Sequence, residues 1–75
     1  MVRAFIMLNV DYGFEKKVLE ELKDMKDVVE AHHVEGVYDV IVVVEAEELD
    51  RLRKTISKIR NMENVCYTLT MIATE

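Results

Sequence analysis

The sequence contains no proline, no tryptophan, two glycines and one cysteine, Cys66. A single thiol excludes a disulfide framework within the chain, and no Cys-x-x-Cys or cysteine–histidine cluster suggests a metal. We therefore expect no disulfide, metal or other cofactor, and one cysteine is typical of a reducing, cytoplasmic setting. A chain of 75 residues buries only about 60% of the surface that its unfolded form exposes. Without disulfides or a metal, oligomerisation is the remaining way in which so small a chain could gain folding stability.

Long apolar runs and an excess of positive charge are also lacking. No segment approaches the roughly 20 apolar residues that span a bilayer, and Arg3 and Asn9 interrupt the N-terminal apolar stretch, which is unlike a signal peptide. The formal net charge is −5, whereas autonomous nucleic-acid binding requires a basic surface. The absence of glutamine, with many glutamates and lysines, hints at a thermophilic source.

The sequence alternates between segments with the hydrophobic pattern of a helix and segments with that of a strand. Apolar residues recur at helical spacing in two segments, at Phe14, Val18, Leu22 and Met25 and at Leu49, Leu52, Ile56 and Ile59. Between them lie stretches rich in β-branched and aromatic residues. The expected elements are a strand over 2–10, a helix over 14–25, strands over 28–35 and 38–46, a helix over 47–60 and a strand over 65–73.

The two halves of the chain share a pattern, because Leu22-x-x-Met25-x-x-Val28 is echoed by Ile59-x-x-Met62-x-x-Val65. Two β-α-β units joined at Gly36 predict an α+β, ferredoxin-like βαββαβ sandwich, in which a four-stranded antiparallel sheet carries both helices on one face. The aliphatic run 40–44 does not alternate with polar residues, so both of its faces require burial. One helix layer covers one face, and the sheet of a second copy is the simplest cover for the other. We therefore predict at least a homodimer that pairs through its sheets.

Few side chains suggest catalysis. His32 and His33 are adjacent on a strand and point to opposite faces, so they cannot jointly chelate one ion. Cys66 has no histidine near it in sequence and is expected to be a small buried hydrophobic residue. We predict no catalytic residue.

Two short motifs indicate a binding site. Gly36-Val37-Tyr38-Asp39 stands before the most hydrophobic strand, where a glycine lets backbone amides approach a ligand and a carboxylate could meet an ammonium group. Thr68 and Thr70 share one face of the last strand, which this topology places at a sheet edge. A structural turn and cross-strand hydroxyl pairs are the alternative interpretations.

Together these parts resemble a known family. The Gly-x-Tyr-Asp joint, the acidic opening of the first helix, the Asn64-Val65 step and the terminal Val-x-x-Thr-x-Thr-x-x-Ala are similar to the C-terminal effector (RAM) domain of the Lrp/AsnC feast/famine transcriptional regulators. The likeness runs over residues 2–74.

The resemblance implies dimers that pair through their sheets and assemble into rings of eight or more subunits, with free amino acids bound between neighbouring dimers. It implies ligand contacts from Gly36, Val37, Tyr38 and Asp39, and from Thr68 and Thr70. Asp39 would hold the amino group, amides near Gly36 the carboxylate, and the threonines the remainder.

The sequence also departs from the family's pattern. Relatives usually carry a DNA-binding helix-turn-helix domain, whereas residues 1–75 are expected to form a single effector domain that contacts no DNA or membrane and joins full-length regulators. Tyr12-Gly13 stands where many relatives have Pro-Gly, and Asn64-Val65 where they often have Gly-Val. Asn64 is a mild change because asparagine tolerates the left-handed conformation. The alternatives are a small dimeric α+β-barrel enzyme and an assembly module that binds nothing.

Overall fold

The chain folds in the order β-α-β-β-α-β, and the computed structural model describes residues 1–74. The elements are β1 (Val2–Val10), α1 (Glu15–Lys23), β2 (Val28–His33), β3 (Val40–Ala46), α2 (Leu49–Arg60) and β4 (Val65–Ala73). The type and order of all six elements confirm the prediction. No helix among the described residues is long and apolar enough to cross a membrane.

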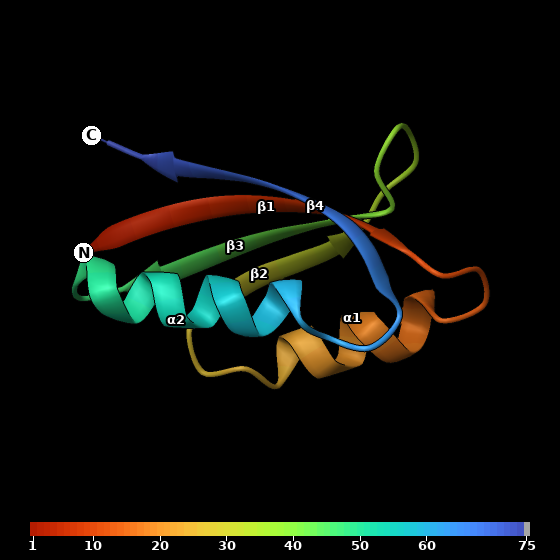
Figure 1. Ribbon diagram of the computed structural model, residues 1–75, viewed down its shortest axis with the longest axis horizontal. Coiled ribbons are helices and arrows are strands. Elements are labelled where there is room, and N and C mark those ends of the chain that lie inside the picture. Colours follow the sequence, from red (N-terminus) through yellow and green to blue (C-terminus); the bar gives the residue numbers. More distant parts are fainter. Residues whose placement is uncertain (75) are drawn as a thin grey trace.

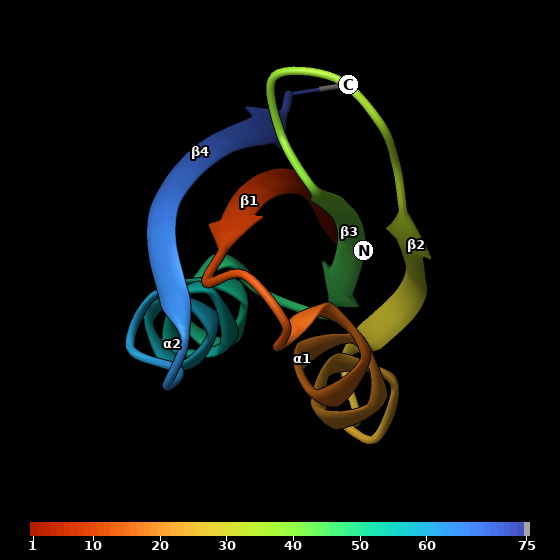
Figure 2. The same cartoon turned by 90° about the vertical axis from the view of Figure 1, so that its right-hand side faces the viewer.

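One antiparallel sheet holds all four strands in the order β2-β3-β1-β4. The two helices lie side by side against one face of this sheet, and the other face carries no helix (Figures 1 and 2). The predicted ferredoxin-like sandwich is therefore confirmed, as is the place of β4 at an edge. We call the face without helices the open face.

The core lies between the helices and the sheet. Its fully buried side chains come from alternate positions of the two central strands and from the inner faces of the helices, and the largest are Ile6, Leu8, Leu22, Leu52, Ile59, Val18, Val40, Val42 and Val44. On β1, the alternate residues Ala4, Ile6 and Leu8 all face this core.

The two halves repeat one turn between helix and strand. The amide of Met25 donates to the carbonyl of Leu22 at 3.1 Å, and that of Val28 donates to Met25 at 3.2 Å. In the second half Met62 donates to Ile59 and Val65 donates to Met62, at 3.2 and 3.4 Å. The repeated sequence pattern therefore encodes a repeated turn. Its second copy includes Asn64 at φ 71°, in the left-handed region that was expected of it.

Three boundaries were predicted too generously. The β2–β3 connection spans residues 34–39, because Gly36 adopts φ +147° and interrupts the extended backbone. Strand β2 therefore ends at His33 and not at residue 35, and β3 begins at Val40 and not at residue 38. Helix α2 begins at Leu49 and not at residue 47, because Glu48 is still extended.

Helix α1 is shorter than the apolar pattern indicated. Phe14 precedes the helix in a turn closed by its amide and the carbonyl of Asp11, and its ring is exposed, with the Lys17 ammonium 5.7 Å from its centre. Met25 follows the helix and packs against the core from the turn. Leu49 is also 40% exposed. The period of 3.6 residues was right, but the predicted stripe of α1 includes two residues outside the helix, Phe14 and Met25.

Asp27 ties the end of α1 to α2 and gives a pH-dependent prediction. Its carboxylate accepts hydrogen bonds from Arg51 Nη2 and Nε at 3.0 and 3.1 Å and from the Thr55 hydroxyl at 2.9 Å. The bonds from Arg51 are the main cause that lowers the pKa of Asp27. We expect Asp27→Asn to reduce the free energy of unfolding by about 1–3 kcal/mol at pH 7.

The sign of the pH dependence follows from the lowered pKa of Asp27. The stabilisation is complete above the unfolded pKa, about 4, and is lost as the pH falls through the folded pKa. Urea unfolding should therefore separate wild type from Asp27→Asn most at pH 7 and less near pH 2.5. Asp24→Asn, an exposed aspartate in the same turn, is the matched control and should have little effect. An equal loss in both variants would contradict the role of Asp27.

Candidate ligand-binding site

The connection of residues 34–39, which we call the β2–β3 loop, stands out from the end of the sheet (Figure 1). The Val34 amide donates to the Asp39 carbonyl at 2.8 Å and closes the base of the loop. The Asp39 amide donates to the Leu8 carbonyl, also at 2.8 Å, which anchors the loop to β1. Gly36 and Val37 at its tip are exposed, and Tyr38 is half-buried. The loop therefore has a fixed base and a free tip.

Asp39 has a structural role that the sequence did not indicate. Its Oδ2 accepts a hydrogen bond from the Val10 amide at 2.9 Å, across the loop from β1. No side chain or amide among residues 1–74 donates to its Oδ1. One oxygen thus holds the end of β1, where the register to β4 shifts between Asn9 and Val10, and the other remains able to accept from a ligand.

Thr68 and Thr70 lie on the helix side of β4. They pair across the sheet with Leu8 and Ile6, both of which are buried under the helices. Both threonines are half-buried. Because β4 is an edge strand, a ligand can approach them from outside the sheet.

Within one chain, the two predicted motifs do not meet. Leu8 pairs with Thr68 on one side and accepts from the Asp39 amide on the other, so β1 separates Asp39 from Thr68 by two strand spacings, about 10 Å. The β2–β3 loop also rises on the side away from the helices, whereas the threonines face the helix layer (Figure 2). These residues cannot surround one small ligand unless a second copy supplies one of the two motifs.

Thr70 instead borders a groove between α2 and β4, which we call the α2–β4 groove. Its volume is about 510 Å³, within the usual range for small-molecule sites. Its lining combines two arginines, two hydroxyl side chains and two isoleucines: Arg53, Arg60, Ser57, Thr70, Ile56 and Ile72. Arg53 and Arg60 form no ion pair with any residue among 1–74. The sequence analysis missed the arginines, although their spacing of seven residues places them on one face of a helix.

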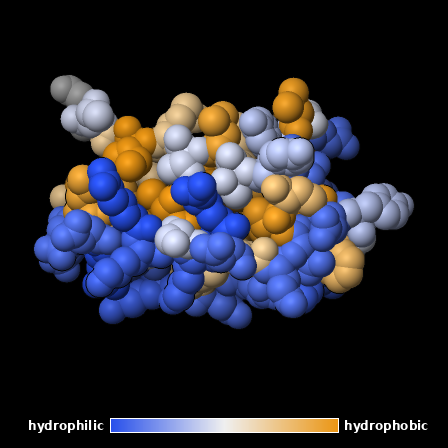
Figure 3. Space-filling model, in the orientation of Figure 1, coloured by the Kyte–Doolittle hydropathy of each residue, from blue (hydrophilic) through white to orange (hydrophobic). Residues whose placement is uncertain are grey.

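The open face is apolar at its centre. Phe5 and Met7 are half-buried, and on β4 Leu69 and Met71 are 43% and 48% exposed. Figure 3 shows hydrophobic side chains gathered over the strands and hydrophilic ones over the helices. Val43 on this face is already buried in the single chain, so part of the two-sided burial predicted for 40–44 is met by neighbouring side chains.

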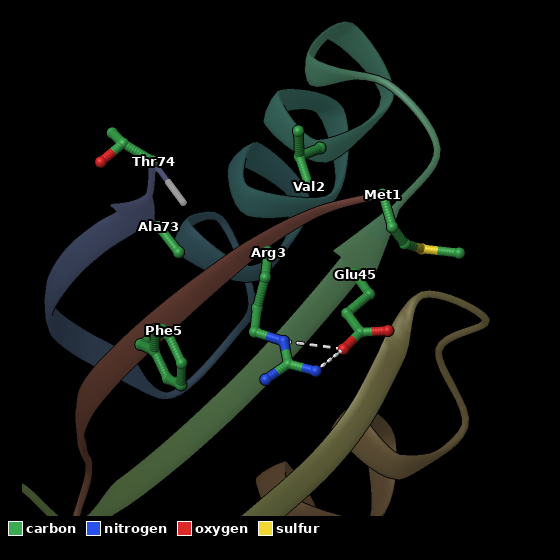
Figure 4. A pocket seen from close by; sticks show the side chains of 7 residues that line it. All are labelled: Met1, Val2, Arg3, Phe5, Glu45, Ala73 and Thr74. Carbon is green, nitrogen blue, oxygen red and sulfur yellow. Dashed lines mark hydrogen bonds and ion pairs between the residues drawn. The ribbon is translucent and has the colours of Figure 1, made fainter.

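Charged pairs border this apolar area. Arg3 and Glu45 are opposite each other on β1 and β3 and form an ion pair, in which Arg3 Nε donates to Glu45 Oε2 at 2.7 Å. Figure 4 shows the pair with Phe5 in a hollow of about 510 Å³ at the end of the sheet. On β2, the His32 ring lies 3.0 Å from the Glu30 carboxylate. Each of these acidic side chains therefore has a basic neighbour on the same chain.

A sequence model described as the Lrp/AsnC ligand binding domain matches residues 3–75. The chain belongs to this family. The resemblance predicted from the Gly-x-Tyr-Asp and Thr-x-Thr motifs is therefore confirmed, and the family is one of regulatory ligand-binding domains.

Solved structures of similar size share this Lrp/AsnC fold over nearly the whole chain. A hypothetical protein from Pyrococcus horikoshii, PHS023, is 45% identical with a TM-score of 0.94, and the match covers 100% of this chain and 92% of that one. FFRP-DM1 is 46% identical with a TM-score of 0.93, over 97% and 99% of the two chains.

Longer regulators match this Lrp/AsnC domain over part of their length. AsnC of E. coli is 25% identical with a TM-score of 0.86, and the match covers 99% of this chain and 51% of AsnC. The HTH-type transcriptional regulator FL11 of Pyrococcus furiosus is 28% identical over 71 residues, which are 95% of this chain and 47% of the regulator. The chain thus spans about half the length of the curated regulator that it matches.

In this Lrp/AsnC domain the prediction that Cys66 is buried is wrong. Cys66 is exposed, because it lies where the register between β1 and β4 shifts. Its thiol donates a hydrogen bond to Asp11 Oδ1 at 2.8 Å. This hydrogen bond raises the pKa of Cys66, and together with a bond from Asn64 it lowers the pKa of Asp11. The thiol is therefore held in its protonated, weakly nucleophilic form.

His32 and His33 point to opposite faces of the sheet, as predicted. His32 pairs with Ile41, on the open face, and His33 pairs with Val40, on the helix side. Among residues 1–74, no three metal-ligating side chains lie close enough together to hold an ion.

Proposed function

We propose that this domain binds a free amino acid as part of a homo-oligomer and modulates transcriptional regulators of the Lrp/AsnC type. The observation that carries the proposal is the match of residues 3–75 to the family's ligand-binding domain. The loop and the threonines lie on opposite sides of the sheet, so a site that uses both motifs requires a second copy.

The proposed dimer pairs two open faces. Sheets that pack face to face lie about 10 Å apart with their inner side chains interdigitated, and the exposed Leu69 and Met71 fit such an interior. Dimers then assemble into an octamer or a larger ring, as the family resemblance implies. The cytoplasm is the setting in which such a domain meets both free amino acids and regulators, and the Pyrococcus relatives favour a thermophilic source.

Each predicted contact has a chemical role in the proposed site. Asp39 Oδ1 accepts from the ammonium group of the amino acid, while Oδ2 keeps its bond to Val10. Backbone amides near Gly36 donate to the carboxylate, and Val37 and Tyr38 border the ligand. The hydroxyls of Thr68 and Thr70 come from another copy and bind the remaining polar groups.

Thermal unfolding in the presence of each of the twenty amino acids, with the mass measured in solution, tests this function. One or a few amino acids should raise the melting temperature, since a ligand at 100 times its dissociation constant adds about 2.7 kcal/mol to the folded state. Asp39→Asn should abolish most of the response, because it removes the negative charge that meets the ammonium group.

Asp39→Asn is more informative than Asp39→Ala because an amide oxygen can still accept from Val10. Its melting temperature without ligand should stay near that of wild type, whereas Asp39→Ala should lower it by losing that bond. A full amino-acid response in Asp39→Asn would make Asp39 purely structural. No response of the wild type to any amino acid would contradict the proposed function itself.

A further inference from the structure

Helix α2 has an unusual charge for this chain. Residues 51–60, RLRKTISKIR, contain five basic residues and no acidic one, whereas the whole chain carries a formal net charge of −5. The helix dipole favours basic residues in the last turn, where Lys58 and Arg60 lie. It gives no reason for the basic residues earlier in the helix, so their surroundings must explain them.

A groove runs between α2 and the turn that follows α1, and we call it the α1–α2 groove. The turn passes beside α2 because Asp27 binds Arg51 and Thr55 (Figure 1). The volume of the groove is about 440 Å³, within the usual range for small-molecule sites. Its lining contains four basic and two acidic side chains: Lys26, Arg51, Lys54, Lys58, Asp24 and Asp27. The groove therefore has a formal surplus of two positive charges in an acidic protein.

The three lysines of the groove have no counter-charge. Asp27 cannot supply one, because Arg51 donates to both of its carboxylate oxygens and Thr55 donates to Oδ2. No carboxylate among residues 1–74 forms an ion pair with Lys26, Lys54 or Lys58. Three ammonium groups thus border one groove without a partner.

The arrangement of these ammonium groups indicates the kind of ligand. Lys54 and Lys58 are four residues apart on α2, and like charges at this spacing destabilise a helix. A multiply charged anion in the groove offsets that repulsion. An ammonium group is a compact point charge, whereas the planar fork of arginine suits a carboxylate. Because Arg51 is already bound to Asp27, the free donors favour phosphate groups over a planar carboxylate.

We propose that the α1–α2 groove binds the phosphate chain of a small polyanion, such as inorganic tripolyphosphate or a nucleoside triphosphate. Lys26 donates to the phosphate oxygens from the turn, and Lys54 and Lys58 donate from the helix. None of the described residues that line the groove is aromatic, so the phosphate chain and not a nucleobase is recognised. The groove lies on the helix layer and stays accessible when two open faces pair (Figure 2). The inference does not depend on the proposed amino-acid site.

Isothermal titration calorimetry with inorganic tripolyphosphate tests this site. It is done without divalent cations and at low ionic strength, because salt screens exposed charges. The wild type should bind tripolyphosphate and ATP with similar affinity, since the two share a phosphate chain. Orthophosphate should bind at least about tenfold more weakly, because it carries fewer charges.

Two variants of the groove should change the affinity in opposite directions. Lys54→Gln/Lys58→Gln should weaken tripolyphosphate binding by at least about tenfold, because it removes two of the three free ammonium groups. Asp24→Asn should strengthen binding, because it removes a carboxylate from the lining. Circular dichroism should show native helix content in both variants, since the altered side chains are exposed. Without ligand, Lys54→Gln/Lys58→Gln should melt no lower than wild type, because a repulsive pair is gone.

The matched control is Arg53→Gln/Arg60→Gln. It removes two positive charges from the same helix, but these arginines line the α2–β4 groove. The control should bind tripolyphosphate nearly as tightly as wild type. Amide chemical shifts in nuclear magnetic resonance spectra give the location independently: with tripolyphosphate they should change in residues 24–27 and 51–58 and stay constant along β4.

Several results would overturn the inference. These are no binding of tripolyphosphate by the wild type, an equal loss of affinity in the arginine control, and shift changes away from the groove. ATP binding without tripolyphosphate binding would assign recognition to the nucleoside, and tighter binding of duplex DNA would make α2 a nucleic-acid contact. Either result also contradicts the proposed ligand. The response of the wild type to the twenty amino acids judges the proposed function separately.

Discussion

Leu69→Asp is expected to convert the protein from a dimer to a monomer at micromolar concentration. Leu69 lies on the open face, in the middle of the edge strand β4 and opposite Met7 on β1. In a dimer paired through this face, the substitution buries a carboxylate without a partner in each copy, which costs about 3–5 kcal/mol per uncompensated charge. The dimer dissociation constant should therefore rise at least about a hundredfold.

The single chain should tolerate this change. Leu69 is 43% exposed before association, and its neighbours on β4 keep their backbone pairing with β1. The monomer should retain its far-ultraviolet circular dichroism, but it should melt at a lower temperature because the dimer no longer stabilises it. Analytical ultracentrifugation across a hundredfold range of concentration measures both the dimer and its loss.

Leu49→Asp provides the control. Leu49 has nearly the same exposure, 40%, but lies at the start of α2 on the helix layer. It should remain dimeric, because this layer faces away from the partner. A dimer that survives Leu69→Asp, or a wild-type protein that is monomeric at micromolar concentration, would contradict pairing through the open face.

Leu52→Ala is expected to give the largest loss of folding stability. The Leu52 side chain is fully buried between α2 and the sheet. Truncation of such a leucine costs about 2–5 kcal/mol, from the lost transfer of apolar atoms and from the cavity that remains. That is a large part of the 5–15 kcal/mol typical of a whole domain. Chemical denaturation should show a midpoint far below that of wild type.

The loss should also depend on protein concentration. If the dimer forms only from folded chains, higher concentration offsets part of the destabilisation by mass action. Leu49→Ala, one turn earlier on the same helix, should change the free energy of unfolding far less because that side chain is exposed. Similar losses at positions 49 and 52 would mean that the first turn of α2 is buried in the assembly.

The sequence predicted most of the fold because its periods are local. The change from strand to helical spacing located all six elements, and the repeated Leu-x-x-Met-x-x-Val and Ile-x-x-Met-x-x-Val steps located two equivalent turns. The errors lie at element ends, where the cap residue Phe14 and the first helical residue Leu49 are apolar and continue the stripe without sharing its burial. Periodicity describes the middle of an element, whereas caps depend on single backbone conformations.

The candidate site was predicted in part. Sequence order pointed to Asp39 and to Thr68 and Thr70, but it could not say which face of the sheet each would occupy. That depends on strand order and register, which place β1 between them. The hydrogen bond from the Val10 amide to Asp39 and the one from the Cys66 thiol to Asp11 join residues far apart in the chain. No local pattern marks such contacts.

By itself, the sequence determined the order of elements, the core positions and the family. Each of these depends on the order and spacing of apolar residues and short motifs along the chain. Only the tertiary structure decided that the loop and the threonines lie on opposite sides of one sheet, and that Arg53 and Arg60 border a groove beside Thr70. The physical reason is that sheet order and helix packing bring together residues whose separation along the chain carries no information about their distance in space.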